Sequence, residues 1–268
     1  MKAGLTFLDD ARRLAESAAP FDEVPDKLHE SVPHPEYCAI WHGQVVNGYS
    51  CQVRIGGVFT HSASSVLDLR TRRDSFEGVV ERSESGKKIP WAFFDVEKLI
   101  RMALHDSILA FELLASPISE KVSDTRTSFA PRRILEASVQ SGIPDQYLQL
   151  AQNQLDNLRR RTEPSFVQVQ RLVRYLLTAA SLIKGEVSLN LNRLAEKHSA
   201  RDIVKQLDEW NDSRHRTAPA ILDTAESLLQ RLQRADTELP ETASDYDRLN
   251  DIVLDARIRS DCQLARPQ

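Results

Sequence analysis

The segment Ser65-Val66-Leu67-Asp68-Leu69-Arg70 places a hydroxyl, a carboxylate and a guanidinium close together in the chain. Side chains at positions i and i+2 of a strand leave the same face, so Val66 and Asp68 would point to one side of an extended segment. Two carboxylates in that relation can share the two Mg²⁺ ions of a nucleotidyl-transfer site. Because valine cannot bind a metal ion, the segment is either a depleted catalytic metal site that keeps Asp68 as its one carboxylate, or an ordinary loop.

Residues near this carboxylate could contribute to a phosphate site. Gly56-Gly57 follows a β-rich run, and glycine lets a phosphate approach backbone N–H groups closely. From the residues alone, a bulge or a tight turn is the simpler explanation of the pair. Ser65 and Arg70 supply the nearest hydroxyl and cation, with a turn serine and a structural salt bridge as the alternatives.

Asp95 is the nearest candidate for a further metal-binding carboxylate. It follows the apolar run 89–94 and precedes a helical pattern, a position at which aspartate commonly caps a helix. The N-cap role is the favoured interpretation, and the metal role is the alternative. The buried side of the following helix is predicted to consist of Val96, Leu99, Ile100 and Ala103.

Strands and helices are both predicted up to about residue 118. Two β-rich runs flank the turn dipeptide Asn47-Gly48, which predicts a hairpin. Further strands are predicted over 67–70 and 89–94, and a second helix over 108–115. An N-terminal helix is predicted from apolar residues at helical spacing, namely Leu5, Leu8, Ala11, Leu14 and Ala15.

Helical patterns dominate the rest of the chain. Apolar residues recur at helical spacing over 165–184, and Gly185 and Pro240 mark breaks. The fold class is therefore α+β, with a lobe of small mixed β-sheet over 1–118 followed by an all-helical lobe over 119–268. The other helices are predicted over 132–140, 145–160, 199–210, 218–236 and 243–260.

Composition excludes several classes of protein. The 268 residues are 41% hydrophobic and 28% charged, which is typical of a globular protein, and no apolar run approaches the length of a membrane span. Acidic residues occupy the place of a signal-peptide core, and the 3 cysteines are far apart in the chain. We therefore expect a cytoplasmic protein with reduced thiols and no membrane partner.

The net charge of −4 conceals a basic middle. Residues 121–184 contain 10 Lys/Arg against 5 Asp/Glu, a balance of +5, whereas both flanks are acidic. Such a segment could face the phosphates of RNA or DNA, or it could form self-solvating helix surfaces. The residues predicted to bind nucleic acid are Arg132, Arg133, Arg159, Arg160, Arg161, Arg171 and Arg174.

The order of these motifs resembles the nucleotidyltransferases of the DNA polymerase β superfamily, above all the phage and bacterial group associated with RNA repair. The resemblance covers about residues 50–260. It rests on Gly56-Gly57, the 65–70 segment, and two pieces that follow with family-like spacing, "KLIRMAL" (98–104) and "ELLASP" (112–117). Two helical pieces complete it, "RLVRYLLTAASLIKGE" (171–186) and "LPETASDYDRLNDIVLDAR" (239–257).

The resemblance implies transfer of a nucleoside monophosphate from an NTP to a nucleic-acid end or another hydroxyl, with Mg²⁺ held by three carboxylates. This chain departs from the family pattern in that Gly57 replaces a serine, Val66 replaces the first carboxylate, and Ser107-Ile108 replaces an Asn-Pro. We therefore expect transfer to be weak or lost.

Two alternatives to this nucleotidyltransferase hypothesis remain open from the sequence. One is an inactive module that keeps the fold and binds a nucleotide, RNA or a protein partner. The other is a ribonuclease that uses Arg193 and His198, whose R-x4-H spacing is also expected by chance.

Overall fold

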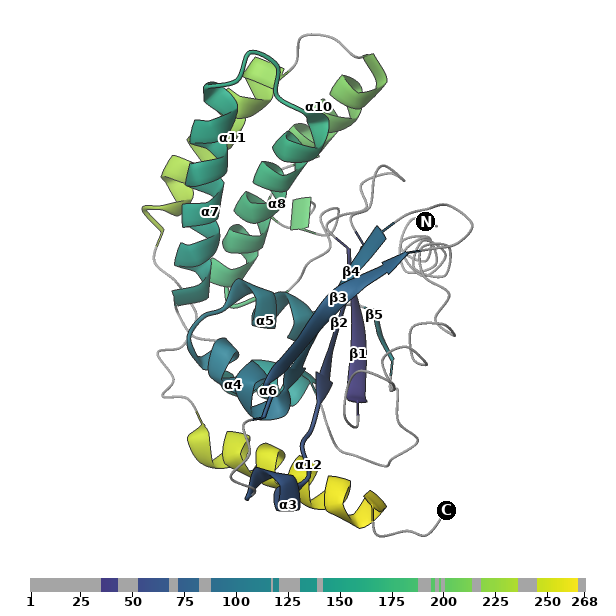
Figure 1. The fold of residues 1–268 in the computed structure, drawn as a ribbon. Coiled ribbons are helices and arrows are strands. Elements are labelled where there is room, and N and C mark those ends of the chain that lie inside the picture. The colour runs from purple at the N-terminus through teal and green to yellow at the C-terminus, as the bar shows by residue number, and fades with distance from the viewer. Residues whose placement is uncertain are drawn as a thin grey trace, which may run out of the picture. The chain divides into compact units, whose positions relative to one another are not determined.

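The computed structural model describes residues 35–42, 53–67, 72–81, 88–116, 118–120, 131–138, 142–187, 194–195, 198, 201–213, 218–235 and 245–264. Figure 1 shows the helices and strands of these ranges. The predicted N-terminal helix and the Asn47-Gly48 turn lie outside them. The chain divides into two compact units, which are described separately.

Unit 1 takes its described residues from Met1–Gly43, Cys51–Val139 and Ala243–Gln268. Its sheet has the strand order β3-β4-β2-β1-β5, in which β2 and β4 are parallel and all other neighbours are antiparallel. The strands are β1 (Pro35–His42), β2 (Val53–Phe59), β3 (Ser75–Glu81), β4 (Lys88–Asp95) and β5 (Ile118–Glu120).

Helices α4 (Val96–Leu104) and α5 (Ile108–Leu114) pack against one face of this sheet, and α6 (Pro131–Ser138) packs on both of them (Figure 1). Side chains of α4 and α5, such as Leu99 and Phe111, and of the central strands, such as Phe59 and Phe93, are buried in the core of the unit. These aromatic and aliphatic side chains supply the hydrophobic stabilisation of the unit.

Strand β3 is an edge strand that the sequence did not predict. It pairs antiparallel with β4, with Gly78 opposite Trp91. A Cβ added at Gly78 would lie 2.6 Å from Cζ2 of Trp91, so the glycine lets the indole lie directly across the strand. The pairing with β4 therefore determines a strand whose own sequence, SFEGVVE, shows little apolar alternation.

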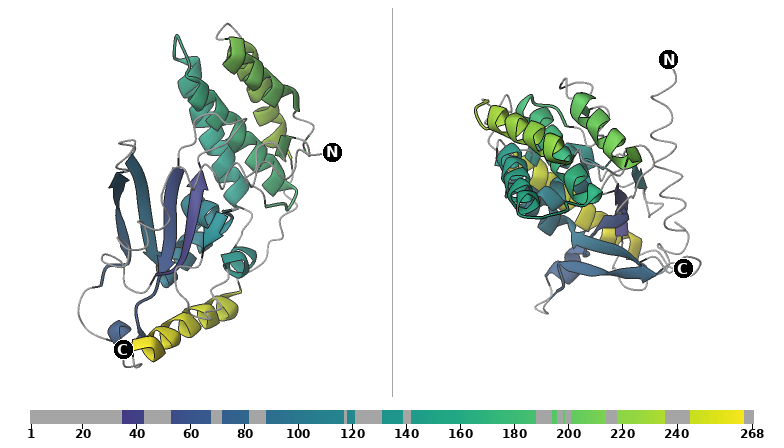
Figure 2. Two further views of the ribbon diagram at one scale, coloured as in Figure 1. Left: turned by 90° about the vertical axis from the view of Figure 1, so that its right-hand side faces the viewer. Right: turned by 90° about the horizontal axis from the view of Figure 1, so that it is seen from above.

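The last helix of the chain, α12 (Tyr246–Leu264), belongs to unit 1. It packs against α3 (Ala63–Val66), α4 and α6, and Figure 2 shows it crossing the end of the sheet beside α3. The compact units therefore differ from the division predicted between residues 118 and 119. The reason is that a segment near the end of the chain returns to the sheet.

Unit 2 contains only helices among its described elements. Helices α7 and α8 form its main pair, α11 packs on both, and α10 packs on α8 and α11. Each of them overlaps a helix predicted from the sequence, α8 from its apolar periodicity, and the α+β fold class is confirmed. These helices are α7 (Gly142–Arg159), α8 (Phe166–Ile183), α10 (Arg201–Ser213) and α11 (Ala218–Leu232).

Candidate functional site

The carboxyl ends of two parallel strands lie side by side in unit 1. Strands β2 and β4 pair with Phe59 opposite Asp95, so the chain leaves both strands at one edge of the sheet. Ligand sites in open sheets are commonly built from residues that follow such strand ends. Here β2 leads through His61 and Ser62 into α3, while Asp95 leads directly into α4.

His61 and Ser62 are both fixed by local contacts. The Nε2 of His61 donates to the carbonyl oxygen of Arg73 at 2.8 Å, and its ring meets Phe59 edge-on with 5.2 Å between centroids. The buried Ser62 is the N-cap of α3, since its Oγ accepts from the backbone N–H of Ser65 at 3.2 Å. A serine hydroxyl group thus stabilises the turn that follows β2.

The structure corrects the prediction that Val66 and Asp68 share a strand. Val66 ends the single helical turn α3, in which its N–H donates to the carbonyl of Ser62 at 3.0 Å. Ser65 strengthens the turn because its Oγ donates to the same carbonyl at 3.2 Å. These serine contacts compete with an extended conformation. Asp68 and Arg70 lie outside the described residues, so their predicted roles stay predictions.

Gly56 and Gly57 do not form a turn. They lie in the middle of β2, where Gly56 is opposite Ala39 and Ala92 and Gly57 is opposite Cys38 and Phe93. Both glycines are buried, and β2 has a strand on each side. Backbone groups of a central strand pair with its neighbours, so a role for this pair in phosphate binding stays a prediction.

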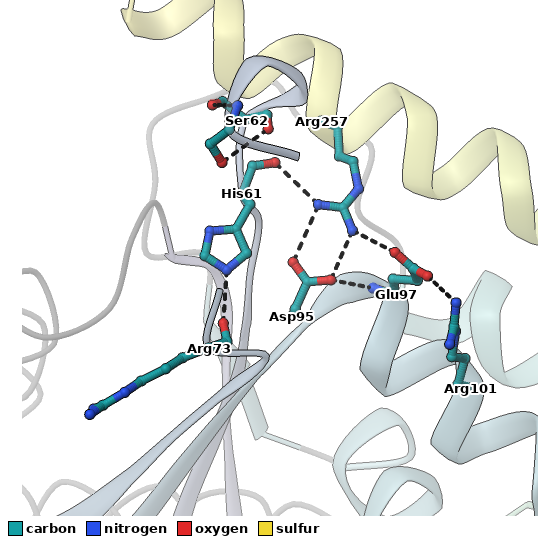
Figure 3. A network of polar contacts seen from close by, with 8 residues as sticks. His61, Ser62, Arg73, Asp95, Glu97, Arg101 and Arg257 are labelled. Carbon is teal, nitrogen blue, oxygen red and sulfur yellow. Dashed lines mark hydrogen bonds and ion pairs between the residues drawn. The ribbon is translucent and has the colours of Figure 1, made fainter. Parts of the chain in front are cut away.

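A buried arginine from the end of the chain occupies the site. Arg257 of α12 extends its guanidinium toward Asp95, Glu97 and the backbone of His61 (Figure 3). One terminal nitrogen donates to Asp95 Oδ1 at 3.0 Å and to Glu97 Oε2 at 2.9 Å. The other lies 3.4 Å from the carbonyl oxygen of His61 and 3.5 Å from Asp95 Oδ2.

Burial makes this ion pair different from those on the surface. The side chains of Arg257 and Asp95 are 7% and 6% exposed. Glu97, which is half-buried, also accepts a short contact from Arg101 one turn along α4. The cluster therefore balances two cations with two anions, as the burial of charge requires.

Asp95 performs the N-cap role that the sequence favoured. Its Oδ1 accepts from the backbone N–H of Glu97 at 3.0 Å, and its own N–H donates to the carbonyl of Asp74 at 2.8 Å. Val96, Leu99, Ile100 and Ala103 are buried as predicted. The alternative metal role of Asp95 stays a prediction, and it would require Arg257 to leave the carboxylate.

Arg257 is the residue of this site that the sequence did not identify. Although it ends one of the motifs that support the family resemblance, no role was predicted for it. The available signal was its position on the buried side of the last helix, beside Ala256 and two turns after Leu249. An arginine within such an apolar face needs a buried partner of opposite charge.

The start of β3 adds an exposed ion pair to the same edge. Lys98 of α4 donates to Asp74 Oδ1 at 2.8 Å and to Ser75 Oγ at 3.0 Å. The hydrogen bond from Lys98 lowers the pKa of Asp74 below its ordinary value, and burial opposes the shift only in part.

The arginines predicted to bind nucleic acid are divided between the units. In unit 1, Arg132 pairs with Glu136 at 3.0 Å, and Arg133 is exposed. In unit 2, Arg159 pairs with Asp223 at 3.1 Å and also contacts Glu226. Two of the predicted arginines, Arg132 and Arg159, are therefore paired with neighbouring carboxylates.

The remaining predicted arginines of unit 2 differ in exposure. Arg160 is exposed, Arg161 is exposed with its guanidinium donating to Gln168 at 3.2 Å, and Arg171 is half-buried. Arg174 is only 8% exposed and lies over the ring of Tyr175, with 5.3 Å from Cζ to the centroid. The predicted contribution of Arg174 to an exposed positive face is therefore wrong, because this face of α8 is buried.

The other predicted chemistry receives no support from the described residues. Arg193 lies outside them, and His198 is half-buried. Within the ranges that the structure describes, no group of three His, Cys, Asp or Glu could hold a metal ion. None of the helices in those ranges is both long enough and apolar enough to span a bilayer.

Comparison with known proteins establishes the family. No match was found among curated proteins. One similar solved structure is a nucleotidyltransferase-like protein from Exiguobacterium sibiricum, with 12% identity over 85% of this chain and 84% of that chain, at a TM-score of 0.31. Residues 50–255 match the family described as "RlaP: RNA repair pathway DNA polymerase beta family". The resemblance noted in the sequence is confirmed, and the chain belongs to the RNA repair pathway DNA polymerase beta family.

Proposed function

We propose that this family member transfers nucleoside monophosphates only weakly or not at all. The observation that carries the proposal is the position of Arg257, whose buried guanidinium contacts both oxygens of Asp95. A carboxylate in that state is not free to bind a metal ion, since the guanidinium would first have to be displaced. The proposal concerns the edge of the sheet where β2 and β4 end.

The chemistry of the family explains why this matters. Two-metal transfer needs carboxylates that share Mg²⁺ and align the attacking hydroxyl with the triphosphate. Val66 supplies none, and Mg²⁺ demands oxygen ligands in nearly ideal octahedral geometry. Within the ranges that the structure describes, the residues therefore do not fit a complete two-metal site, and Asp68, which lies outside those ranges, is the one proposed catalytic carboxylate that remains.

A transfer assay tests the proposal directly. Each of the four labelled NTPs is incubated with Mg²⁺, a single-stranded RNA acceptor, and the wild-type protein or its Asp68→Ala variant. We expect the wild type to form no more product than Asp68→Ala does. Robust transfer that Asp68→Ala abolishes would overturn the proposal, because it would show that the site is complete in the wild type.

A second candidate function is the binding of RNA without transfer. Arg133 and Arg160 favour it, since both are exposed and neither makes an ion pair within the described part of the chain. Membership of an RNA repair family makes RNA the first nucleic acid to test. Binding of a labelled oligonucleotide that persists without any transfer would support this candidate.

A further inference from the structure

Three oxygen-bearing groups converge on one point at the ends of β2 and β4. They are the carboxylates of Asp95 and Glu97 and the backbone carbonyl of His61, and all three face the same guanidinium (Figure 3). Carboxylate and carbonyl oxygens are the ligands that hard divalent cations prefer. The group that meets them here is a side chain of the protein itself.

The guanidinium suits this environment through its shape and its attachment. Its planar fork directs donors to Asp95, Glu97 and His61 at the same time, with distances from 2.9 to 3.5 Å. Because Arg257 is joined to α12, which packs on α3 and α4, its local concentration is fixed by the fold. A free cation would have to displace a covalently attached competitor.

We propose that Arg257 takes the place of a divalent cation at this edge of the sheet. The side chain neutralises Asp95 and Glu97 and links the end of β2 to the start of α4, as a bound cation would. This inference rests on the proposed function in one respect, since both take the ends of β2 and β4 as the functional site. It adds that the C-terminal helix supplies the positive charge there.

Replacement of Arg257 tests whether a cation can take over its role. The variant Arg257→Met keeps much of the buried apolar length but leaves two carboxylates near each other without their shared partner. Thermal melting of the full chain is measured in chelator, Mg²⁺ and Mn²⁺. We expect a lowered melting temperature in chelator and a rise of about 4 °C or more at saturating cation, because binding to the folded state stabilises it.

Two matched variants assign the response to this site. Arg259→Met removes a half-buried arginine of the same helix, which pairs with Asp255 one turn away, and should gain no cation response. The double variant Asp95→Asn/Arg257→Met should lose the cation response that Arg257→Met gains. In the presence of Arg257, the cation response of Asp95→Asn should equal that of the wild type.

Three results would overturn this proposal. A wild-type cation response that Asp95→Asn abolishes would show that Asp95 binds metal beside Arg257 and would overturn the proposal. So would an Arg257→Met protein that shows no cation response, or one that stays unfolded by circular dichroism in both chelator and cation. Transfer by the wild type, in contrast, would overturn only the proposed function, since melting temperatures do not depend on it.

Discussion

Each unit of the protein buries one of the arginines described above, and the two are held in different ways. Arg257 in unit 1 contacts carboxylates that lie about 160 residues earlier in the chain. Arg174 in unit 2 lies over the ring of its neighbour Tyr175, on a helix whose buried polar side chains recur at helical spacing. That buried polar stripe of α8 consists of Gln170, Arg174, Thr178 and Ser181.

Buried polar side chains therefore have different roles in the two units. The cluster around Arg257 joins α12, α4 and the end of β2, so it determines which segments of the chain meet. The stripe on α8 follows one helix, and one of its members makes a local hydrogen bond, from Ser181 Oγ to the carbonyl of Glu186 at 3.0 Å. A buried charge that links distant segments is expected to cost more when one partner is removed.

The largest effect is expected from Arg257→Met. Its removal leaves Asp95 buried without its cationic partner, which costs about 3–5 kcal/mol of unfolding free energy. Urea denaturation of the full chain in chelator measures the loss. Arg259→Met is the control, because its half-buried pair with Asp255, one turn apart on the same helix, is expected to contribute less than about 1 kcal/mol. Equal losses of unfolding free energy in the two variants would contradict the greater importance assigned to the buried pair of α12.

Arg174→Met should have a smaller effect. Methionine keeps the apolar length of the side chain but removes the contact with the ring of Tyr175, which is expected to contribute about 1–2 kcal/mol when it is desolvated. The same denaturation experiment measures it. A loss as large as that of Arg257→Met would contradict the distinction between the units, and would indicate that Arg174 also neutralises a buried charge.

Local sequence patterns predicted one side of the Arg257 cluster but not the other. The N-cap role of Asp95 and the buried face of α4 depend on residues within two turns, so they can be predicted from the sequence. The pairing of Arg257 depends on a contact across 162 positions, which no local pattern contains. The same holds for β3, because its pairing with β4 makes it a strand.

The segment after β2 shows how a local pattern can also mislead. Alternation over 65–70 indicated a strand, but Ser62 and Ser65 supply the hydrogen bonds of a helical turn that ends at Val66. Hydrogen bonds of this kind, between side chains and the backbone, favour the helical turn over an extended segment, and the apolar residues described there are half-buried or exposed. Leu67, for example, is 84% exposed.

The salt dependence of RNA binding should distinguish the exposed arginines of the two units from the buried Arg174. The variants Arg133→Ala and Arg160→Ala remove exposed arginines, whereas Arg174→Met removes a buried one. If single-stranded RNA binds, each exposed arginine that contacts a phosphate should contribute about 0.7 to the slope of log affinity against log salt. Fluorescence anisotropy titrations at several salt concentrations measure the slope. A slope lowered by Arg174→Met but by neither exposed variant would contradict this assignment.

The smallest effect is expected at the exposed counterpart of the Arg257 pair, the contact between Lys98 and Asp74. The hydrogen bond from Lys98 lowers the pKa of Asp74 in the folded protein. Ionised Asp74 therefore contributes stability at a pH above the pKa that it has in the unfolded chain. That contribution is lost as the pH falls through the lowered folded pKa. Because the Asp74 side chain is 65% exposed, solvent screens the pair, and we expect Asp74→Asn to cost less than about 0.5 kcal/mol at neutral pH.

The pH dependence of this variant separates the exposed pair from the buried one. The wild type and Asp74→Asn are compared by urea denaturation at neutral pH and at successively lower pH. Their small difference should disappear once Asp74 is protonated in both the folded and the unfolded states, since the linkage of its pKa to stability ends there. It should also shrink at high salt, because an exposed pair is screened. A difference that persists in strong acid would show that the Asp74 side chain stabilises the start of β3 through its hydrogen bond with Ser75, and not through its charge.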